Sequence, residues 1–321
     1  MTTAPPVAAT PSDAPSDTDY PFRVYEPHKA GLPKLGPYSR ELWQRRQFAA
    51  EMSRASMRAA NTRTVFGQIW LVLNPLLLAA VYYLLVNVLT GRRQGWDYFA
   101  HLTAGLFTFY FISGSMSAGA GSIVGGGKLL LNTAFPRLLM PLSAVRTAFF
   151  RYLPTLPVFF FFLLLAVNTP VSIPSRAPTQ TDAQFAKAVS SAVVHHAALT
   201  WRTALAVVFI VMILVFASGL AAVFATVQVY FRDTSSFLPY FVRIWLYLSP
   251  VLFYADQMQK FKPYVYLNPL YSLLGGFTDL AVLSKIPPAV VWEQALFWTI
   301  ITPIVGFWYL MSRERDFAVR I

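Results

Sequence analysis

Residues 205–254 read LAVVFIVMILVFASGLAAVFATVQVYFRDTSSFLPYFVRIWLYLSPVLFY. Two long apolar runs lie on either side of a very short polar tip, Arg232-Asp233-Thr234-Ser235-Ser236. An α-helix needs about 20 predominantly apolar residues to cross the hydrocarbon core of a bilayer. The stretch therefore predicts a helical hairpin embedded in a membrane, with one small loop at its tip.

The composition of the whole chain supports a membrane protein. Of its 321 residues, 56% are hydrophobic and only 12% are charged, whereas soluble domains carry about 25% charged residues. The absence of cysteine excludes disulfides, thiol chemistry and Cys-ligated metals. The net charge of +12 indicates basic cytoplasmic loops and contact with anionic lipid rather than with nucleic acid.

The N-terminal region divides into two parts before the first span. Residues 1–37 are rich in Pro, Ala, Ser, Thr and Asp, and we expect a disordered cytoplasmic tail. Residues 38–60 have the period of an amphipathic helix, although Arg45 interrupts its apolar arc. A basic amphipathic helix before a first span is expected to lie in the headgroup layer as an interface helix. An ordinary solvated juxtamembrane helix is the alternative.

The remainder, residues 61–321, predicts an all-α integral membrane domain with six transmembrane helices. The expected spans are residues 65–89, 98–124, 142–167, 205–229, 237–254 and 290–311. Before the last span, residues 264–283 are apolar but interrupted by Asn268-Pro269 and Gly275-Gly276. Each half is too short to cross a bilayer, so we expect a re-entrant pair of half-helices there.

Basic residues near the span ends predict the orientation, because they favour the cytoplasmic side. The side that holds both termini, the loop between spans two and three, and the tip of the hairpin carries most of them. They are Arg40, Arg45, Arg46, Arg54, Arg58, Arg63, Lys128, Arg137, Arg232, Arg313, Arg315 and Arg320. We therefore expect a multi-pass protein of the cytoplasmic membrane with both termini inside, and residues 168–203 as its one sizeable external loop.

Several motifs that suggest enzyme chemistry fail on inspection. The Gly125-Gly126-Gly127-Lys128 run lacks the earlier glycine and the following Ser or Thr of a phosphate-binding loop. No paired acidic motif is present, and Asp279 and Glu293 are best explained as structural groups near the external interface. The adjacent His195-His196 have no evident partner ligand, so no metal site is predicted. The chain is therefore expected to be neither an enzyme nor a nucleotide-binding protein.

The loop between the second and third spans, GGGKLLLNTAFPRLLMPLSA at residues 125–144, is too apolar for a plain solvated loop. Gly127 can start a short helix that ends before Pro136. A short cytoplasmic helix with an apolar face requires a groove on a partner protein. A helix resting on the bilayer surface is the alternative.

Aromatic side chains concentrate in the predicted spans, and flat rings stack on sugar C–H surfaces without fixing one register. We therefore consider a conduit for a sliding polysaccharide, lined by Tyr82, Tyr83, Phe107, Tyr110, Phe111, Trp245 and Tyr247. Packing against lipid and interfacial aromatic belts are the alternative explanation.

Four stretches together resemble one known family. They are TVFGQIWLVLNPL (64–76), NTAFPRLLMPLSA (132–144), VQVYFRDTSSFLPYFVRIWLYLSPVLFY (227–254) and YLNPLYSLLGGFTDL (266–280). Their order over residues 38–321 is similar to the membrane subunits of ABC-2 type polysaccharide exporters, the Wzm/TagG group that moves O-antigens and teichoic acids. The Pro/Ala-rich N-terminus further suggests an actinobacterial galactan exporter.

The resemblance implies a homodimer of this chain bound to two copies of a cytoplasmic ATPase, which would hold the ATP and Mg²⁺. It implies that residues 38–54 form the interface helix and that Asn268, Pro269, Gly275 and Gly276 belong to a gate. The residues implied to couple to the ATPase are Lys128, Leu129, Leu130, Leu131, Asn132, Thr133, Phe135, Arg137, Arg232 and Asp233. The external loop at 168–203 is longer than the family pattern.

These observations lead to one functional hypothesis, that the chain is the permease half of an ATP-driven exporter of lipid-linked polysaccharide for the cell envelope. Arg63, Arg146 and Arg151 are candidates for binding the diphosphate of a polyprenyl carrier, because arginine can contact phosphate bidentately. Their alternative role is positive-inside anchoring. The rival functions are an ABC-2 permease for a small amphiphile or drug, and a polytopic glycosyl- or prenyltransferase.

Overall fold

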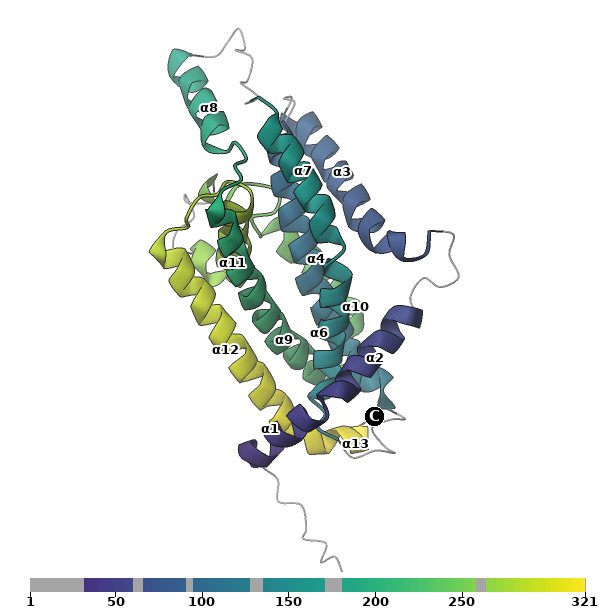
Figure 1. The fold of residues 1–321 in the computed structure, drawn as a ribbon. Coiled ribbons are helices and arrows are strands. Elements are labelled where there is room, and N and C mark those ends of the chain that lie inside the picture. The colour runs from purple at the N-terminus through teal and green to yellow at the C-terminus, as the bar shows by residue number, and fades with distance from the viewer. Residues whose placement is uncertain are drawn as a thin grey trace, which may run out of the picture. The chain divides into compact units, whose positions relative to one another are not determined.

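The computed structural model describes residues 32–59, 66–90, 95–127, 135–170, 181–257 and 264–320 of the chain. In these ranges every regular element is a helix, and residues 32–321 form one structural unit (Figure 1). The all-helical fold expected from the sequence is therefore confirmed. The expected tail at 1–37 lies outside the described residues as far as position 31.

Two short helices, α1 (Leu35–Gln44) and α2 (Arg46–Ala59), precede the bundle. The helix expected at 38–60 is thus present, with a one-residue interruption at Arg45, where the apolar arc was broken in the sequence. The inner face of α2 packs against α6 (Leu139–Tyr152), and the Thr147 hydroxyl donates to the buried Ser53 hydroxyl at 3.0 Å.

Four helical segments are long and apolar enough to cross a membrane. They are Gly67–Leu89, Leu139–Asn168, Trp201–Tyr230 and Ala289–Asp316. They contain α3 (Trp70–Thr90), α6 with α7 (Thr155–Asn168), α9 (Ala206–Tyr230) and α12 (Ala289–Arg313). These segments correspond to the first, third, fourth and sixth spans expected from the sequence, so a multi-pass membrane protein is supported.

The second expected span is the 30-residue helix α4 (Trp96–Gly125), which is not among these four apolar segments. It is instead enclosed within the bundle, with α3, α6, α7, α9, α10 and α11 packed around it. Most of its side chains are buried. A helix surrounded by protein rather than lipid tolerates Gly, Ser and Thr, which permit close helix packing.

The fifth expected span, residues 237–254, differs from the structure. Helix α10 runs from Thr234 to Tyr247 and has 14 residues, which is about 21 Å at 1.5 Å per residue. Residues 248–254 continue as turns and bends, and residues 255–257 form a short stretch of 3₁₀ helix. This helix alone is too short to cross a hydrocarbon core of about 30 Å.

The expected pair of re-entrant half-helices is also not seen. A short turn of 3₁₀ helix, η4 (Tyr264–Leu267), leads into a single helix, α11 (Pro269–Ala281). The Asn268-Pro269 pair starts α11, since the Asn268 side chain accepts from the Leu270 amide and Pro269 occupies the first turn. Gly275-Gly276 lie inside α11 and do not break it. A Cβ at Gly276 would collide with the Phe209 ring of α9, so glycine at this position allows the two helices to pack closely.

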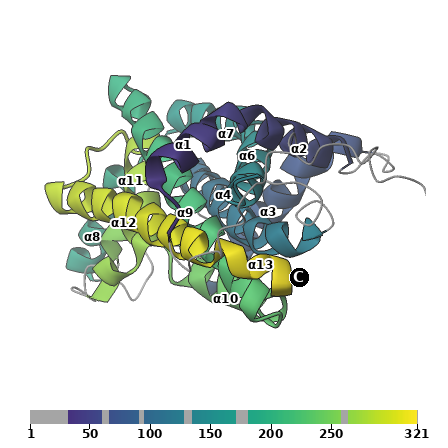
Figure 2. The same cartoon turned by 90° about the horizontal axis from the view of Figure 1, so that it is seen from below.

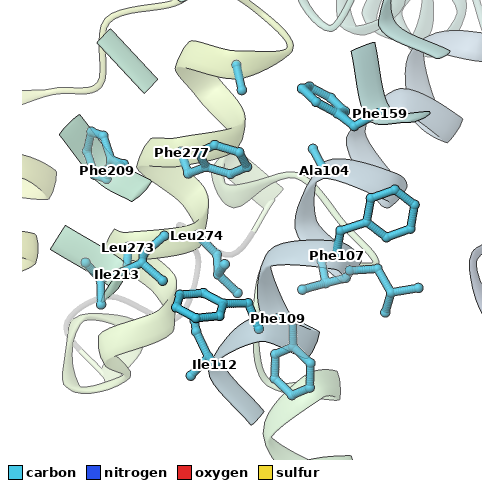
Figure 3. Packing of buried hydrophobic residues seen from close by; sticks show 14 of the residues in the cluster. Ala104, Phe107, Phe109, Ile112, Phe159, Phe209, Ile213, Leu273, Leu274 and Phe277 are labelled. Atoms are coloured by element: carbon cyan, nitrogen blue, oxygen red, sulfur yellow. The ribbon is translucent and has the colours of Figure 1, made fainter. Parts of the chain in front are cut away.

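The buried core lies where α4, α9 and α11 meet. Figure 3 shows Phe109 and Ile112 of α4 facing Leu273, Leu274 and Phe277 of α11, with Phe209 and Ile213 of α9 on the left side of α11. All of these side chains are almost completely buried. The core therefore holds α11 firmly inside the bundle.

The contacts at the two ends of the bundle define which loops lie together. At one end the Arg137 amide contacts Glu314 and Tyr230 contacts Asp316, so the loop before α6, the end of α9 and the end of α12 meet (Figure 2). At the other end, Asp97 at the start of α4 accepts from the Ala197 amide, and Ala198 donates to the Val282 carbonyl. Helix α8 (Asp182–Val194) lies in the expected external loop.

Candidate functional site

The main cavity of the described residues has a volume of about 490 Å³ and lies between α3, α4 and α6, reaching the start of α7. It is lined by Trp70, Leu71, Asn74, Pro75, Phe107, Tyr110, Phe111, Gly114, Ala118, Ala144, Thr147, Ala148, Arg151, Tyr152 and Thr155. Its size falls in the range of ligand pockets, which is about 300–1,000 Å³. On α4 and α6 the lining residues recur every three or four positions, so each helix presents one continuous face to the cavity.

The cavity joins two groups of residues that the sequence singled out separately. Phe107, Tyr110 and Phe111 were candidates for the sugar conduit, and Arg151 was a candidate for the diphosphate. The Nε atom of Arg151 is buried and has no hydrogen-bond partner among the described residues. A guanidinium at a cavity with an unused, buried donor atom is a ready contact for an anionic oxygen.

The far wall of the cavity is fixed by an interaction between α4 and α6. Tyr152 stacks on Phe111 with ring centroids 5.4 Å apart, and its hydroxyl lies 3.1 Å from the Thr108 hydroxyl. Tyr152 was not among the site residues predicted from the sequence. The signal was present, because Tyr152 lies four residues after Ala148 and eight after Ala144, on the same face of α6.

The three arginines proposed for diphosphate binding are not brought together. Arg146 does not line the cavity and instead places its guanidinium over the Phe150 ring, 4.9 Å from the centroid. It is five residues before Arg151, which corresponds to a different face of α6. Arg63 lies outside the described residues. Only Arg151 among them is at the cavity.

The other aromatic candidates lie apart from this cavity. Tyr82 and Tyr247 pack edge-on with ring centroids 6.4 Å apart, joining α3 to the end of α10. Tyr83 packs edge-on against Phe99 at 5.3 Å. Trp245 donates from Nε1 to the Asn268 Oδ1 atom at 2.9 Å, so it connects α10 to the start of α11.

The residues implied to contact an ATPase are only partly described. Lys128, Leu129, Leu130, Leu131, Asn132 and Thr133 lie outside the described residues. Phe135 packs against Phe48 of α2 with ring centroids 4.9 Å apart. Arg232 and Asp233 are exposed at the tip between α9 and α10, where Gln228 Nε2 donates to the Arg232 carbonyl at 3.0 Å.

A second cavity, of about 300 Å³, lies at the opposite end of the bundle from the Arg137–Glu314 contact. One predicted gate residue, Gly275, lines it. Its polar lining includes His195, Asp256, Asp279 and Lys285. His195 Nε2 lies 3.0 Å from Asp256 Oδ2, which connects the external loop to the segment before α11. In the described part of the chain no three His, Asp or Glu side chains are grouped as metal ligands.

The four apolar segments and a largely apolar cavity beside them define the class of the molecule, a polytopic membrane protein. No family model matches the chain. It is similar to two O-antigen export system permease proteins RfbA of Klebsiella pneumoniae. One is 27% identical over 79% of this chain and 87% of the relative, and the other is 27% identical over 68% and 73%.

A third relative, the O-antigen export system permease protein RfbA of Myxococcus xanthus, is 24% identical over 88% of this chain and 98% of the relative. The similarity therefore covers most of the bundle rather than one motif. It confirms the resemblance to polysaccharide-exporter permeases that the sequence motifs indicated. The narrower suggestion of an actinobacterial galactan exporter stays a prediction.

Proposed function

We propose that this chain is the permease subunit of an ATP-driven ABC exporter that moves lipid-linked polysaccharide across the cytoplasmic membrane. The observation that carries the proposal is the similarity to O-antigen export permeases along nearly the whole length of the Myxococcus relative. The cavity with five aromatic side chains and an arginine that has an unused buried donor is consistent with a substrate that has both sugar rings and phosphate.

A permease of this type needs a separate ATPase, because the sequence lacks a phosphate-binding loop. We infer two ATPase subunits that bind ATP and Mg²⁺, and a homodimer of this chain that completes the conduit. The interface pair α1 and α2, the loop around Phe135 and the end of α9 lie at one end of the bundle. Such a surface is suited to one cytoplasmic partner.

For the topology, we infer six crossings with both termini in the cytoplasm. The four apolar segments would supply four of them, α4 the fifth, and α10 with the turns after it the sixth. The segment after α12 contacts the end of α9 through Tyr230 and Asp316. This contact supports the arrangement, because six crossings place the C-terminus and the tip between α9 and α10 on the same side of the membrane.

For the substrate, we infer that the carrier diphosphate contacts Arg151 and that the first sugars lie along Phe107, Tyr110 and Phe111. The Asn74 side chain at the same cavity adds a neutral polar contact. Arg151 and the loop at Arg137 are joined by helix α6. A push from the ATPase on that loop would therefore travel along α6 to the cavity.

A permease for a small amphiphile or drug would share this fold. Measuring whether polysaccharide or drugs stimulate the ATPase of the complex distinguishes that rival from a polysaccharide exporter. A glycosyl- or prenyltransferase needs paired acids for a metal diphosphate, and none are found in the sequence. Mass spectrometry of lipids that copurify with the native complex would identify the carrier.

The proposal is tested by Arg151→Gln and the matched control Arg146→Gln in the complex with its native ATPase. Loss of a charge-assisted contact costs about 1.5–3 kcal/mol, so Arg151→Gln should reduce ATP-driven transport of lipid-diphosphate-linked glycan by about tenfold or more. Arg146→Gln should stay within about twofold of wild type, because Arg146 does not line the cavity. Equal effects of both variants would contradict the assignment of Arg151.

A further inference from the structure

The last residues of the chain turn back beneath the bundle instead of ending at α12. After Arg313, the turn η5 (Glu314–Asp316) and the short helix α13 (Phe317–Arg320) lie at the same end as α1 and α10 (Figure 2). We propose that this C-terminal segment, residues 313–320, is a coupling anchor. It would hold the loop that rejoins α6, the interface helix α1 and the end of α9 in one fixed arrangement. The inference rests on the proposed exporter function and goes beyond it.

The first contact of the anchor is made by Glu314. The Arg137 backbone amide donates to Glu314 Oε1 at 2.6 Å, between positions 177 residues apart in the chain. Arg137 follows directly on the loop segment implied to dock with the ATPase. Glu314 therefore holds the point at which that segment rejoins the bundle.

The second contact brings the interface helix to the same carboxylate. The Tyr38 hydroxyl of α1 lies close enough to Glu314 to interact electrostatically. That hydroxyl and Nη1 of Arg137 are both buried, and neither has a hydrogen bond of good geometry among the described residues. Polar groups of α1 and of the loop before α6 thus converge on Glu314, which makes it a positioning residue for both.

The third contact is apolar. Phe317 is fully buried in a cluster with the ends of α4 and α9 and the start of α6. Its buried neighbours include Ile123, Val229 and Met140, and Tyr38 and Phe135 pack on the edge of the cluster. One side chain of the C-terminal segment therefore fills the space between the cytoplasmic ends of three helices.

The fourth contact reaches the tip between α9 and α10. The Tyr230 hydroxyl donates to Asp316 Oδ2 at 2.7 Å, and the Arg320 guanidinium lies over the Tyr230 ring at 4.5 Å. Tyr230 directly precedes the turn that holds Arg232 and Asp233. The segment therefore contacts α1, the loop before α6 and the end of α9, which all adjoin the surface that the ATPase is expected to contact. A rigid anchor of this kind converts a push on one element into a shift of all of them.

The test uses the full complex with the native ATPase in proteoliposomes and compares Glu314→Ala, Glu314→Gln and the control Glu293→Ala. Glu293 is an exposed glutamate near the start of α12, at the opposite end of that helix from Glu314. We expect Glu314→Ala to bind the ATPase in wild-type stoichiometry and to hydrolyse ATP, but to transport at least about fivefold less polymer per ATP. Glu314→Gln should recover most of the loss, because its amide oxygen still accepts from the Arg137 amide. Glu293→Ala should match wild type.

The anchor is wrong if polymer per ATP is unchanged in Glu314→Ala. It is also wrong if Glu314→Ala and Glu314→Gln lose transport in parallel with their thermal stability, since a merely structural role predicts that pattern. If the wild-type complex itself moves no polysaccharide, the exporter function fails instead, so the two failures are distinguishable.

A cross-linking experiment keeps the test decisive if Glu314→Ala assembles poorly. The chain has no cysteine, so Arg137→Cys with Glu314→Cys offers one pair, joined by a short bismaleimide or blocked separately with N-ethylmaleimide. We expect the joined form to transport more polymer per ATP than the blocked form, because the link replaces the lost contact. Less transport by the joined form would show that the segment must release the loop, which contradicts an anchor.

Discussion

At the residue scale, the tightest contact between α9 and α12 depends on glycine. A Cβ at Gly306 would collide with the carbonyl oxygen of Gly219, and a Cβ at Gly219 would collide with the backbone of Pro303. The two helices can approach this closely only because both positions lack a side chain. The glycines therefore determine how α12 closes the bundle.

Gly306→Ala is expected to destabilise the protein by about 1–3 kcal/mol, the usual cost of overpacking, and to lower the thermal midpoint of the purified protein in detergent. The control is Gly121→Ala on α4, where nothing lies within 4 Å of the added Cβ. That variant should be unchanged or slightly more stable, since alanine is favoured over glycine in a helix. A Gly306→Ala protein as stable as Gly121→Ala would show that the helices can separate without cost.

Asp279 of α11 gives a prediction of pH dependence. Burial raises the pKa of its carboxyl from 3.8 to about 7, with Lys285 opposing and Asp256 adding to the rise. Between pH 4 and pH 7 the folded carboxyl keeps a proton that the unfolded one has released, so stability falls as pH rises through that window and is level above it. Helix α11, with 13 residues, is too short to be a span.

Asp279→Asn is expected to remove this loss, because the amide is neutral at every pH. The thermal midpoint should rise relative to wild type at pH 8 and change little at pH 4. The comparison is Asp182→Asn, an exposed aspartate at the start of α8, which should leave the pH profile as it is. A wild-type profile that does not fall between pH 4 and pH 7 would show that the carboxyl is better solvated than its burial implies.

At the element scale, the start of α11 is fixed by one side chain. Oδ1 of Asn268 accepts from Trp245 Nε1 at 2.9 Å and from the Leu270 amide at 3.1 Å, and Nδ2 donates to the Leu248 carbonyl at 2.8 Å. These bonds cap α11 and attach it to the end of α10. The two helices are therefore expected to move as one body.

Asn268→Ala removes a helix cap worth about 1 kcal/mol and two further hydrogen bonds worth about 1 kcal/mol each. We expect a loss of about 2–3 kcal/mol in stability, seen as a lower denaturation midpoint. Asn168→Ala at the exposed end of α7, where the side chain bonds only the Leu164 carbonyl, is the control and should lie within about 0.5 kcal/mol of wild type. Equal midpoints for the two variants would mean that α10 and α11 are held by packing alone.

The elements differ in how far the sequence could predict them. Long uninterrupted apolar runs such as residues 206–230 give their helices almost directly, because hydropathy and length suffice. The sequence interpretation of α11 was wrong because it took Gly275-Gly276 as a helix break. In the structure the absence of a side chain at Gly276 makes room for the Phe209 ring of α9. The end of α10 at Tyr247 was missed because the residues after it stay apolar while the backbone turns.

The candidate site shows the same limit of sequence reasoning. Arg146 and Arg151 have equal charge and similar neighbours in the sequence, and only the rotation of α6 decides which one faces the cavity. The Glu314 contact with Arg137 could not be predicted, because no local pattern joins residues 177 positions apart. Sequence periodicity gives helix faces, whereas the pairing of those faces comes from tertiary packing.

At the scale of the whole molecule, the contacts place groups of loops at opposite ends. The Arg137–Glu314 and Tyr230–Asp316 contacts define one end, and the contacts of Asp97 with Ala197 and of Ala198 with Val282 define the other. Basic residues are concentrated in the loops of the first end, so the positive-inside rule predicts that this end is cytoplasmic. Side-specific labelling tests this assignment directly.

The chain has no cysteine, so single cysteines report accessibility without background. We place them at the exposed positions Ser39 in α1, Ser235 in the tip at the start of α10, and Leu199 before η2 (Trp201–Leu205). A membrane-impermeant maleimide applied to intact cells is expected to label Leu199→Cys only. Ser39→Cys and Ser235→Cys should react after permeabilisation, because the charge of their flanking arginines keeps that end inside. Labelling of Ser39→Cys in intact cells would invert the topology and place the coupling anchor on the wrong side for any cytoplasmic ATPase.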